Sequence, residues 1–351
     1  MGTPKRVSLY LKGKAMKHCR RVIGCCLSVF MLLPVHRAAA GDNAITLSTT
    51  PRSFSRFGIG KMSSELTFLG GLTLTSDNRS FGGFSGLDVT RDGQRFISVS
   101  DQGHWLTGRF IYENGRLKGI AEARLAPILN HEGNPDERKS RIDAEAVAAW
   151  SAKGIEGKVI VGFERRERVE QFNIGKHGLK ATAHRVRSPK ALSSGQKNGE
   201  LEALGRFTEG PLKGWLVAIS ERNHARDDSL RGWLWRKGKT HEFHIPRHED
   251  YLVTGLAILP GGKEIVTVER SFTPPIMVGM ALRRFSIDQL QNRNTGPGKL
   301  LFAGKLTAYQ IDNMEGIAAH RDERGTVLTV ISDDNFNKSV QSTVIFQFRL
   351  N

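Results

Sequence analysis

The stretch "NMEGIAAHRDERGTVLTVISDD", Asn313–Asp334, contains the pattern on which the fold prediction rests. A short apolar segment, "GIAA", leads into a turn rich in charge and glycine. The alternating run "TVLTVIS" follows and stops at an acid. Alternating β-branched residues bounded by turn residues are typical of antiparallel strands. The stretch therefore predicts a hairpin whose second strand ends at Asp333.

Four similar stretches precede it in the chain. They read "FSGLDVTRDGQRFISVSD" from Phe84, "DAEAVAAWSAKGIEGKVIVGFE" from Asp143, "ELEALGRFTEGPLKGWLVAISE" from Glu200 and "VTGLAILPGGKEIVTVER" from Val253. Their small residues after the first polar position, Gly86, Ala146, Ala203, Gly255 and Gly316, are spaced by 60, 57, 52 and 61 residues. A repeat of this length is typical of stacked supersecondary units.

Each copy is followed by two more strand-like runs, such as "GWLWRKG" and "THEFHIP" after the third copy. Four antiparallel strands per repeat are the blade of a β-propeller. We therefore predict an all-β chain with five blades, although a sixth, degenerate blade is compatible with the spacing. A β-sandwich with coincidental self-similarity is the alternative.

The two ends of the repeat region predict how the ring closes. The last copy is one strand short after "STVIFQFRL", whereas "ELTFLGGLTLTS" from Glu65 precedes the first copy without a partner. Pairing these terminal strands removes two exposed sheet edges. We expect a propeller over residues 66–351, preceded by a lead-in over residues 41–65.

Residues 1–40 have the pattern of an export signal. They contain eight Lys or Arg and no acid, a 14-residue apolar core from Val22 to Val35, and "HRAAA" before Gly41. The core is shorter than the roughly 20 residues of a membrane-spanning helix, so we expect cleavage before Gly41. Residues 1–15 fit an upstream extension, since Met16 begins a more typical signal. We expect the protein to be periplasmic or secreted. Its export would use either the general secretory pathway or the twin-arginine pathway.

The composition of the remaining chain narrows its chemistry. All three cysteines lie within residues 1–40, so we expect no disulfides and no zinc–thiolate site afterwards. The rest carries 44 Lys and Arg against 35 acids, a net charge of about +9 that favours anionic partners such as phosphate esters. A merely soluble charged surface is the alternative. The chain has no basic stripe rich in aromatic residues, so its sequence gives no indication of nucleic-acid binding. We expect a monomer without a transmembrane helix.

Acids recur at the blade edge where first strands begin and second strands end. Because antiparallel neighbours share that edge, these residues should meet on one face. Strand starts supply Glu145, Glu202 and Glu315, with Ser85 and Thr254 in the other two blades. Strand ends supply Asp101, Glu164, Glu221, Glu269 and Asp333.

Carboxylates gathered in this way repel one another unless cations neutralise them. One solution is Ca²⁺, which binds six to eight oxygen ligands, so all eight acids are candidate metal ligands. The other is the set of arginines that follow the acids, Arg165, Arg166, Arg222 and Arg270, which could also bind an anionic substrate. A third interpretation is that the acids only fasten neighbouring blades.

Two histidines, His104 and His224, each lie three residues beyond a strand-end acid and are candidate general acids or bases. The longest connections also fall on this face, where function usually lies. The sequence contains no G-x-S-x-G elbow, zincin motif, Walker loop or dinucleotide fingerprint. We therefore expect no nucleotide, flavin or haem.

The segments "GGFSGLDVTRDGQRFISVSDQG", "DAEAVA" with "VIVGFERRERVEQF", "LEALGRF" with "LVAISE", and "DNMEGIAAHRDERGTVLTVISDDNF" resemble the phytase-like (esterase-like) domain family of secreted bacterial proteins. The resemblance covers about Leu66 to Leu350. It implies a β-propeller related to calcium-dependent propeller phytases, which hydrolyse phosphate monoesters at an acid-lined mouth. By this analogy the carboxylates hold Ca²⁺, and Arg165, Arg222, His224 and Arg270 receive phosphate oxygens. The chain lacks the dense aspartates and lysines of true propeller phytases, so the analogy does not extend to phytate.

Two function classes follow. The first is a calcium-assisted phosphoester or ester hydrolase that acts on a small anionic or ester substrate. The second is a non-catalytic propeller that binds an envelope ligand or a partner through the same face. Fold alone does not separate them.

Overall fold

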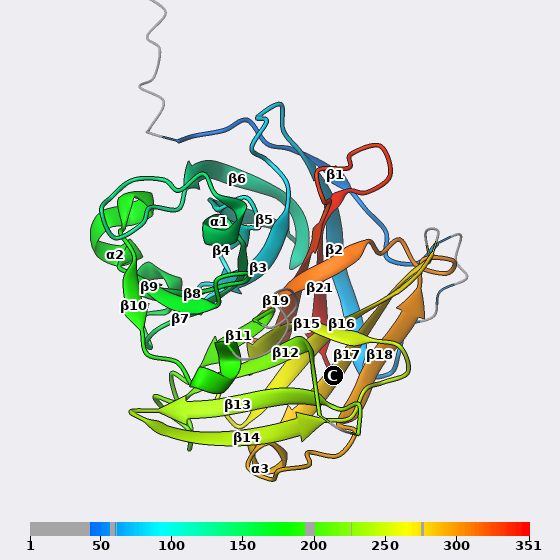
Figure 1. Cartoon of the computed structure of the whole chain (residues 1–351). Helices are drawn as coiled ribbons and strands as arrows, with labels where there is room; N and C mark the ends of the chain where they lie inside the picture. The colour runs from blue at the N-terminus through cyan, green and yellow to red at the C-terminus, as the bar shows by residue number, and fades with distance from the viewer. Residues whose placement is uncertain (1–42, 57–59, 61, 194–200, 226, 275–276) are drawn as a thin grey trace, which may run out of the picture. The chain divides into compact units, whose positions relative to one another are not determined.

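Five antiparallel sheets, whose first strands contact one another around a common axis, build the described part of the chain (Figure 1). The structure is a computed structural model that describes residues 43–56, 60, 62–193, 201–225, 227–274 and 277–351. The predicted export signal lies outside these residues. The innermost strands of neighbouring sheets contact one another. This arrangement confirms the predicted β-propeller and gives it five blades.

The first four blades each consist of four strands that are consecutive in the chain and hydrogen-bonded in that order. The first blade contains β3 (Phe84–Val89), β4 (Arg95–Ser100), β5 (His104–Glu113) and β6 (Arg116–Pro127). The second contains β7 (Ala144–Ala149), β8 (Val159–Phe163), β9 (Arg168–Phe172) and β10 (His184–Val186). The third contains β11 (Ala203–Arg206), β12 (Leu216–His224), β13 (Leu230–Arg236) and β14 (Lys239–Ile245). The fourth contains β15 (Leu252–Ile258), β16 (Glu264–Thr273), β17 (Met277–Ser286) and β18 (Lys299–Lys305).

The fifth blade joins the two ends of the chain, as predicted. Its first three strands are β19 (Asn313–Asp322), β20 (Gly325–Asp333) and β21 (Thr343–Leu350). The fourth is β2 (Leu66–Thr75), which pairs antiparallel with β21 so that Leu72 lies opposite Ile345. A fifth strand, β1 (Ser48–Pro51), adds to the outer edge of β2. The folded sheet therefore extends into the predicted lead-in.

The lead-in also contributes to the core through Phe54, which is buried. Its ring lies 5.1 Å from that of Phe302 in the fourth blade, and 5.3 and 4.9 Å from those of Phe346 and Phe348 in the fifth. Aromatic rings at such separations bury large apolar areas and hold a fixed geometry. Phe54 therefore helps to fasten the last two blades together.

In the described part of the chain, helices occur only in the connections between strands. They are α1 (Lys139–Ile142), α2 (Ile174–His177), α3 (Ile287–Leu290) and the 3₁₀ turns Gly154–Glu156, Gly178–Lys180 and Lys190–Ser193. The helix α1 lies in the long connection from β6 to β7, on the face where the repeat predicts the acids. On the opposite face, β3–β4, β15–β16 and β19–β20 have the expected tight turns.

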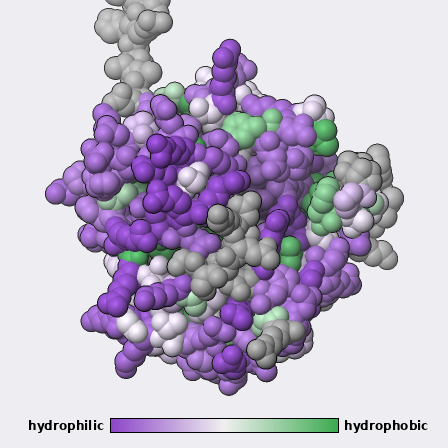
Figure 2. All heavy atoms as spheres, viewed as in Figure 1, coloured by the Kyte–Doolittle hydropathy of each residue, from purple (hydrophilic) through white to green (hydrophobic). Residues whose placement is uncertain are grey.

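The surface of the described residues is largely polar. Figure 2 shows hydrophilic side chains over most of the viewed face, with small, separate hydrophobic areas. The exposed large hydrophobic side chains are Ile111, Phe272, Leu300 and Val340. Among the described residues, no helix has the length and apolar character needed to cross a bilayer.

Candidate functional site: an acidic mouth at one end of the channel

Four inner strands begin with a β-bulge, and the bulged residue is the one that the repeat places at the strand start. In the first blade, Phe84 pairs with Ser100 and Gly86 with Val99, which leaves Ser85 without a ladder partner. The strand register shifts in the same way in the second, fourth and fifth blades. The residues left without a ladder partner there are Glu145, Thr254 and Glu315. Glu202 directly precedes β11. Bulges re-aim side chains, and two of the four bulged residues, Glu145 and Glu315, are acids.

The strand-start acids meet at the channel. Glu145, Glu202 and Glu315 line a cavity of about 10 Å³ together with Ser85, which is room for about one water-sized ligand. Glu145 and Glu315 are buried, whereas Glu202 keeps partial contact with solvent. The structure thus brings together the three glutamates that the repeat placed at one position.

The strand-end position holds four acids and one arginine. Two residues beyond the partners of Gly86, Ala146, Ala203, Gly255 and Gly316, the second strands carry Asp101, Glu164, Glu221, Arg270 and Asp333. In the fourth blade, Glu269 lies one residue earlier, and a one-residue offset turns a side chain to the other face of a sheet. Glu269 is buried and bonded to Arg283 at 2.7 Å and to the Thr267 hydroxyl at 2.7 Å. The structure therefore separates Glu269 from the other predicted ligands.

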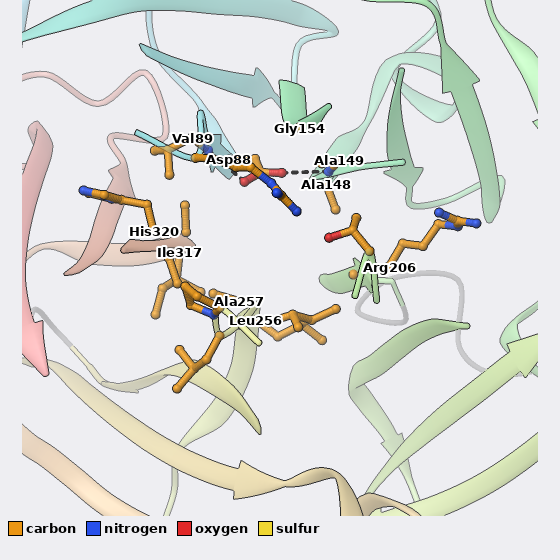
Figure 3. Close-up of a pocket in the computed structure, with 18 of the residues that line it drawn as sticks. Asp88, Val89, Ala148, Ala149, Gly154, Arg206, Leu256, Ala257, Ile317 and His320 are labelled. Atoms are coloured by element: carbon orange, nitrogen blue, oxygen red, sulfur yellow. Dashed lines mark hydrogen bonds between the residues drawn. The ribbon is translucent and has the colours of Figure 1, made fainter. Parts of the chain in front are cut away.

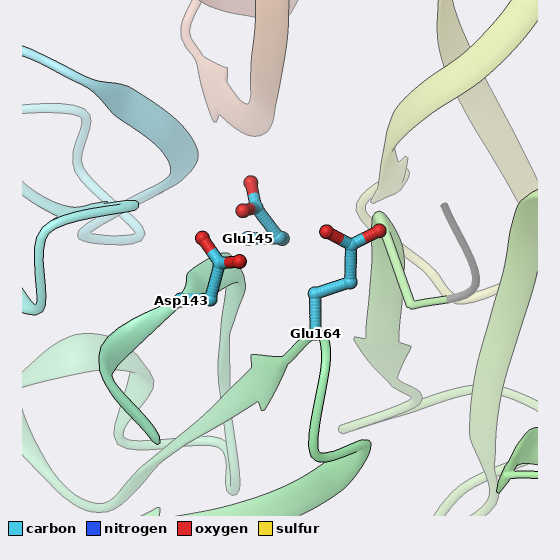
Figure 4. Close-up of side chains that lie close together, drawn as sticks. All are labelled: Asp143, Glu145 and Glu164. Atoms are coloured by element: carbon cyan, nitrogen blue, oxygen red, sulfur yellow. The ribbon is translucent and has the colours of Figure 1, made fainter. Parts of the chain in front are cut away.

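Three carboxyl groups lie closest together, those of Asp143, Glu145 and Glu164 (Figure 4). Each offers one ligand atom within 4.8 Å of the others, and all three residues are buried. Asp143 was not among the predicted ligands, although it begins the copy "DAEAVA" two residues before Glu145. The available signal was the interval of two residues, which recurs in the last copy. Asn313 precedes Glu315 by the same interval.

Burial and mutual repulsion raise the pKa of the acids at this mouth. The pKa of Glu145 is raised well above its ordinary value, first by burial and then by Glu202 and Asp143. Burial followed by Glu221 does the same for the pKa of Glu202. Burial, with Asp143 and Glu221, raises the pKa of Glu164 to about 7. Buried carboxyl groups with like-charged neighbours hold protons near neutral pH unless a cation is bound.

The remaining mouth acids follow the same logic. Burial raises the pKa of Glu315, although Arg270 opposes the change. Burial and then Glu315 raise the pKa of Asp333 well above its ordinary value. The fifth blade therefore adds two carboxyl groups with a raised pKa to those of the second and third blades at this mouth.

A lysine and an arginine neutralise part of this charge on one side. Lys139, on α1, places its Nζ 2.5 Å from Asp143 Oδ1 and 2.6 Å from Asp101 Oδ2. The Nε of Arg165 donates to the other oxygen of Asp143. Burial tends to lower the pKa of Lys139, but the two aspartates outweigh it and the pKa is raised. Lys139 was not predicted, because its loop position shows no repeat.

A second pair of cationic side chains, those of Arg270 and Arg222, binds Glu221 of the third blade. Arg270 donates to Glu221 Oε1 at 2.9 Å and to Asn313 Oδ1 at 2.8 Å, and Asn313 in turn donates to Glu315 Oε1 at 2.7 Å. Arg222 donates to the other oxygen of Glu221 at 2.9 Å. Within the described residues, no ion pair reaches Glu145 or Glu202. The built-in cations therefore pair with Asp101, Asp143 and Glu221, and not with Glu145 or Glu202.

The donor set suits a hard divalent cation such as Ca²⁺. All candidate ligands are oxygen atoms, and Ca²⁺ accepts carboxylates in irregular geometry. Asp101 Oδ1 is buried without a hydrogen-bond partner in the described structure, and the 10 Å³ cavity adjoins Glu145. Both oxygens of Asp143 already bind cationic side chains. The candidate ligands are therefore Glu145, which lies in reach of Glu164 and also lines the cavity, and its neighbours Glu164 and Glu202.

The two candidate histidines have different surroundings. His104 begins β5, its Nδ1 is buried without a hydrogen-bond partner in the described structure, and burial lowers its pKa. His224 ends β12 and places Nδ1 2.6 Å from Asp228 Oδ1. Arg247 holds the other oxygen of Asp228 at 2.9 Å. His224 is thus oriented by a carboxylate, as proton-transferring histidines often are.

The channel is interrupted below the acids. Five buried aliphatic side chains, one from each inner strand, line both the small cavity and a pocket of about 260 Å³ at the opposite end; they are Leu87, Val147, Leu204, Leu256 and Ile317. They therefore lie between the two. In the opposite pocket (Figure 3), Asp88 accepts from the Ala149 backbone at 2.7 Å and links two blades. Burial raises the pKa of Asp88 to about 6.

Comparison with known proteins places the chain in a family. No curated protein matches the sequence significantly. Similar solved structures include Kuenenia stuttgartiensis hydrazine synthase, with 12% identity and a TM-score of 0.34 over 72% of this chain. The chain spans 56% of that protein.

Two further similar structures are U3-55K, with 10% identity and a TM-score of 0.39, and the RRP9 WD40 repeats, with 9% identity and a TM-score of 0.39. They cover 82% and 86% of this chain, and it covers 99% and 100% of theirs. The model of the Phytase-like family, described as "Esterase-like activity of phytase", matches residues 79–336. This match spans all five inner strands and the acidic mouth, and the chain belongs to the Phytase-like family.

Proposed function

We propose that this protein is an exported, calcium-assisted hydrolase of phosphoesters or carboxylic esters that acts at the acidic mouth. The position of Glu145 carries the proposal. It is buried with a carboxylate oxygen within 4.8 Å of oxygens of Asp143 and Glu164, and no ion pair reaches it within the described residues, so it needs a further positive charge to ionise beside them. Family membership supports it. Export through the signal of residues 1–40 is part of the proposal.

Glu145, Glu164 and Glu202 would hold the ion, with Asp101, Glu221, Glu315 and Asp333 around them. When bound, calcium would supply a positive charge that polarises the phosphoryl or carbonyl oxygen of the substrate. Glu269 has no part in this, since it is bonded to Arg283 inside the fourth blade.

Arginines at the rim would orient the substrate. Arg165 and Arg222 each use Nε on an acid and are exposed, so their terminal amines are available for an anionic oxygen. Arg270 has both terminal nitrogens engaged, by Glu221 and Asn313. We therefore assign Arg270 a positioning role in place of direct phosphate contact.

Proton transfer would fall to His224, because a bound cation would keep Glu164 ionised. His224 is oriented by Asp228 and has Nε2 for this purpose. His104 is the weaker candidate, because burial lowers its pKa and favours a neutral ring.

The test is a panel of chromogenic phosphate and carboxylate esters, assayed with millimolar Ca²⁺ and with a chelator. We expect calcium-dependent hydrolysis that Glu145→Gln and Glu164→Gln each reduce by at least about tenfold, as loss of an interaction worth 1.4 kcal/mol would. Glu323→Gln is the matched control, because Glu323 is exposed on the β19–β20 turn. Hydrolysis indifferent to calcium, or equal loss in the control, would contradict the proposal. Mass spectrometry of exported protein should find a start at Gly41.

The alternative is a non-catalytic propeller that binds a ligand through the same face. It is favoured by the cations already in place, since Lys139, Arg165 and Arg270 offset part of the acidic charge without a metal. In that case purified protein hydrolyses none of the esters, with or without calcium, while its melting temperature is unchanged by either calcium or chelator.

A further inference from the structure

A second polar pocket lies beside the acidic mouth, between the first and second blades. It has a volume of about 570 Å³ and is lined by the β6–β7 connection and the β8–β9 turn. Five arginines line it, namely Arg141, Arg165, Arg166, Arg168 and Arg185, against the acids Asp136, Glu167 and Glu170. The positive side chains outnumber the negative ones, so the pocket favours an anion.

Two of these arginines are committed to the walls. Arg168 places Nε 3.0 Å from Glu170 and its guanidinium 3.8 Å from the centre of the Phe163 ring. Its terminal nitrogens donate to the backbone oxygens of Arg166 and Arg141. Arg141 binds Asp136 at 3.3 Å, while its Nε is buried without a hydrogen-bond partner in the described structure.

Three arginines leave donors open to a ligand. Arg166 and Arg185 are exposed, and their side chains make no ion pair or hydrogen bond within the described residues. Arg165 spends Nε on Asp143 and adopts a positive φ of 55°, which is uncommon for a residue with a side chain and marks a site that the surrounding structure enforces. Arg165 thereby belongs to the pocket and to the acidic mouth at once.

We propose that this arginine pocket binds a dianionic phosphoryl group, with Arg165, Arg166 and Arg185 as the residues that contact it. Guanidinium groups donate two parallel hydrogen bonds to phosphate oxygens, and several of them around one cavity match the charge and shape of a phosphoryl group. The inference rests on the proposed function in one respect. The phosphoryl group belongs to the substrate, and it anchors the molecule while the scissile ester lies at the acidic mouth.

The first experiment measures binding without catalysis. Inorganic pyrophosphate is titrated calorimetrically into metal-free protein at low ionic strength, where surface charges are least screened. The pocket variant is Arg166→Gln/Arg185→Gln. The matched control is Arg116→Gln/Arg324→Gln, which removes two exposed arginines outside the pocket. Both are surface changes, and melting curves check that each variant is folded.

We expect pyrophosphate to bind the wild type and the control alike, and the pocket variant at least about tenfold more weakly, because two guanidinium groups that donate charge-assisted hydrogen bonds are removed. No measurable binding to the wild type, or equal weakening in the control, would overturn the inference.

The second experiment separates this inference from the proposed function. Among esters that the protein hydrolyses, the pocket variant should raise KM for those with a phosphoryl group about tenfold or more, while KM for neutral esters is unchanged. If no ester is hydrolysed but pyrophosphate binding depends on Arg166 and Arg185, the hydrolase proposal fails and the pocket assignment stands. If esters are hydrolysed with unchanged KM in the pocket variant, the pocket assignment fails alone.

Discussion

The guanidinium of Arg270, in β16, donates to the carboxylate of Glu221, in β12, at 2.9 Å and so joins the fourth blade to the third across the mouth. It stands where the four other blades have an acid, and it is the largest source of attraction for Glu315. One cation therefore holds together acids from two further blades.

Replacing Arg270 with Gln should destabilise the protein by about 2–4 kcal/mol, because removal of one partner leaves largely buried carboxylates uncompensated. Arg222→Gln removes the more exposed partner of the same Glu221 and should cost less than about 1 kcal/mol. Urea unfolding measures both. Equal costs for the two variants would mean that Arg270 acts only as a surface charge.

The stability of metal-free protein should fall as pH rises from about 4.5 through about 7. The pKa of Glu164 is about 7 when folded, against an ordinary 4.5, so the folded state retains a proton that the unfolded chain releases. Its stabilising contribution is complete below pH 4.5 and lost through pH 7.

Melting temperatures in chelator across this range measure the effect. Glu164→Gln should make the profile less steep, whereas Glu323→Gln should leave it unchanged. A wild-type profile that rises with pH would show that the mouth acids are ionised in the folded protein.

Calcium should raise the melting temperature at pH 7.5 by several degrees. A ligand that binds only the native state stabilises it by about 2.7 kcal/mol at a hundredfold excess over Kd. Differential scanning calorimetry with and without calcium tests this, and Glu145→Gln/Glu202→Gln should abolish the response. A response of full size in this variant would place the ion elsewhere.

Phe54→Ala should destabilise the propeller by about 3–5 kcal/mol, since it empties a site packed between two blades.

Deletion of Ser342–Leu350 should unfold the whole domain, because β21 pairs with both β2 and β20. Thermal unfolding tests both variants. A truncated protein with an unchanged melting temperature would rule out this closure.

The repeat predicted the blade, its closure and the shared face of Glu145, Glu202 and Glu315, because these depend on strand order and spacing. It did not predict Glu269 correctly within the fourth blade. A spacing argument aligns the last acid of each strand, but the ladder aligns Arg270 with Asp101 and Glu164. Nor did it find Asp143 or Lys139. The partner of an acid in a loop is set by packing, which leaves no period in the sequence.

The acidic mouth is closed at its inner end by five aliphatic side chains, Leu87, Val147, Leu204, Leu256 and Ile317. A ligand that enters over the acids must leave through the same opening. If the mouth hydrolyses esters as proposed, a product would compete with the next substrate molecule for this opening, and slow release of an anionic product would limit turnover. Variants that weaken anion contacts at the rim would then speed release even as they weaken capture.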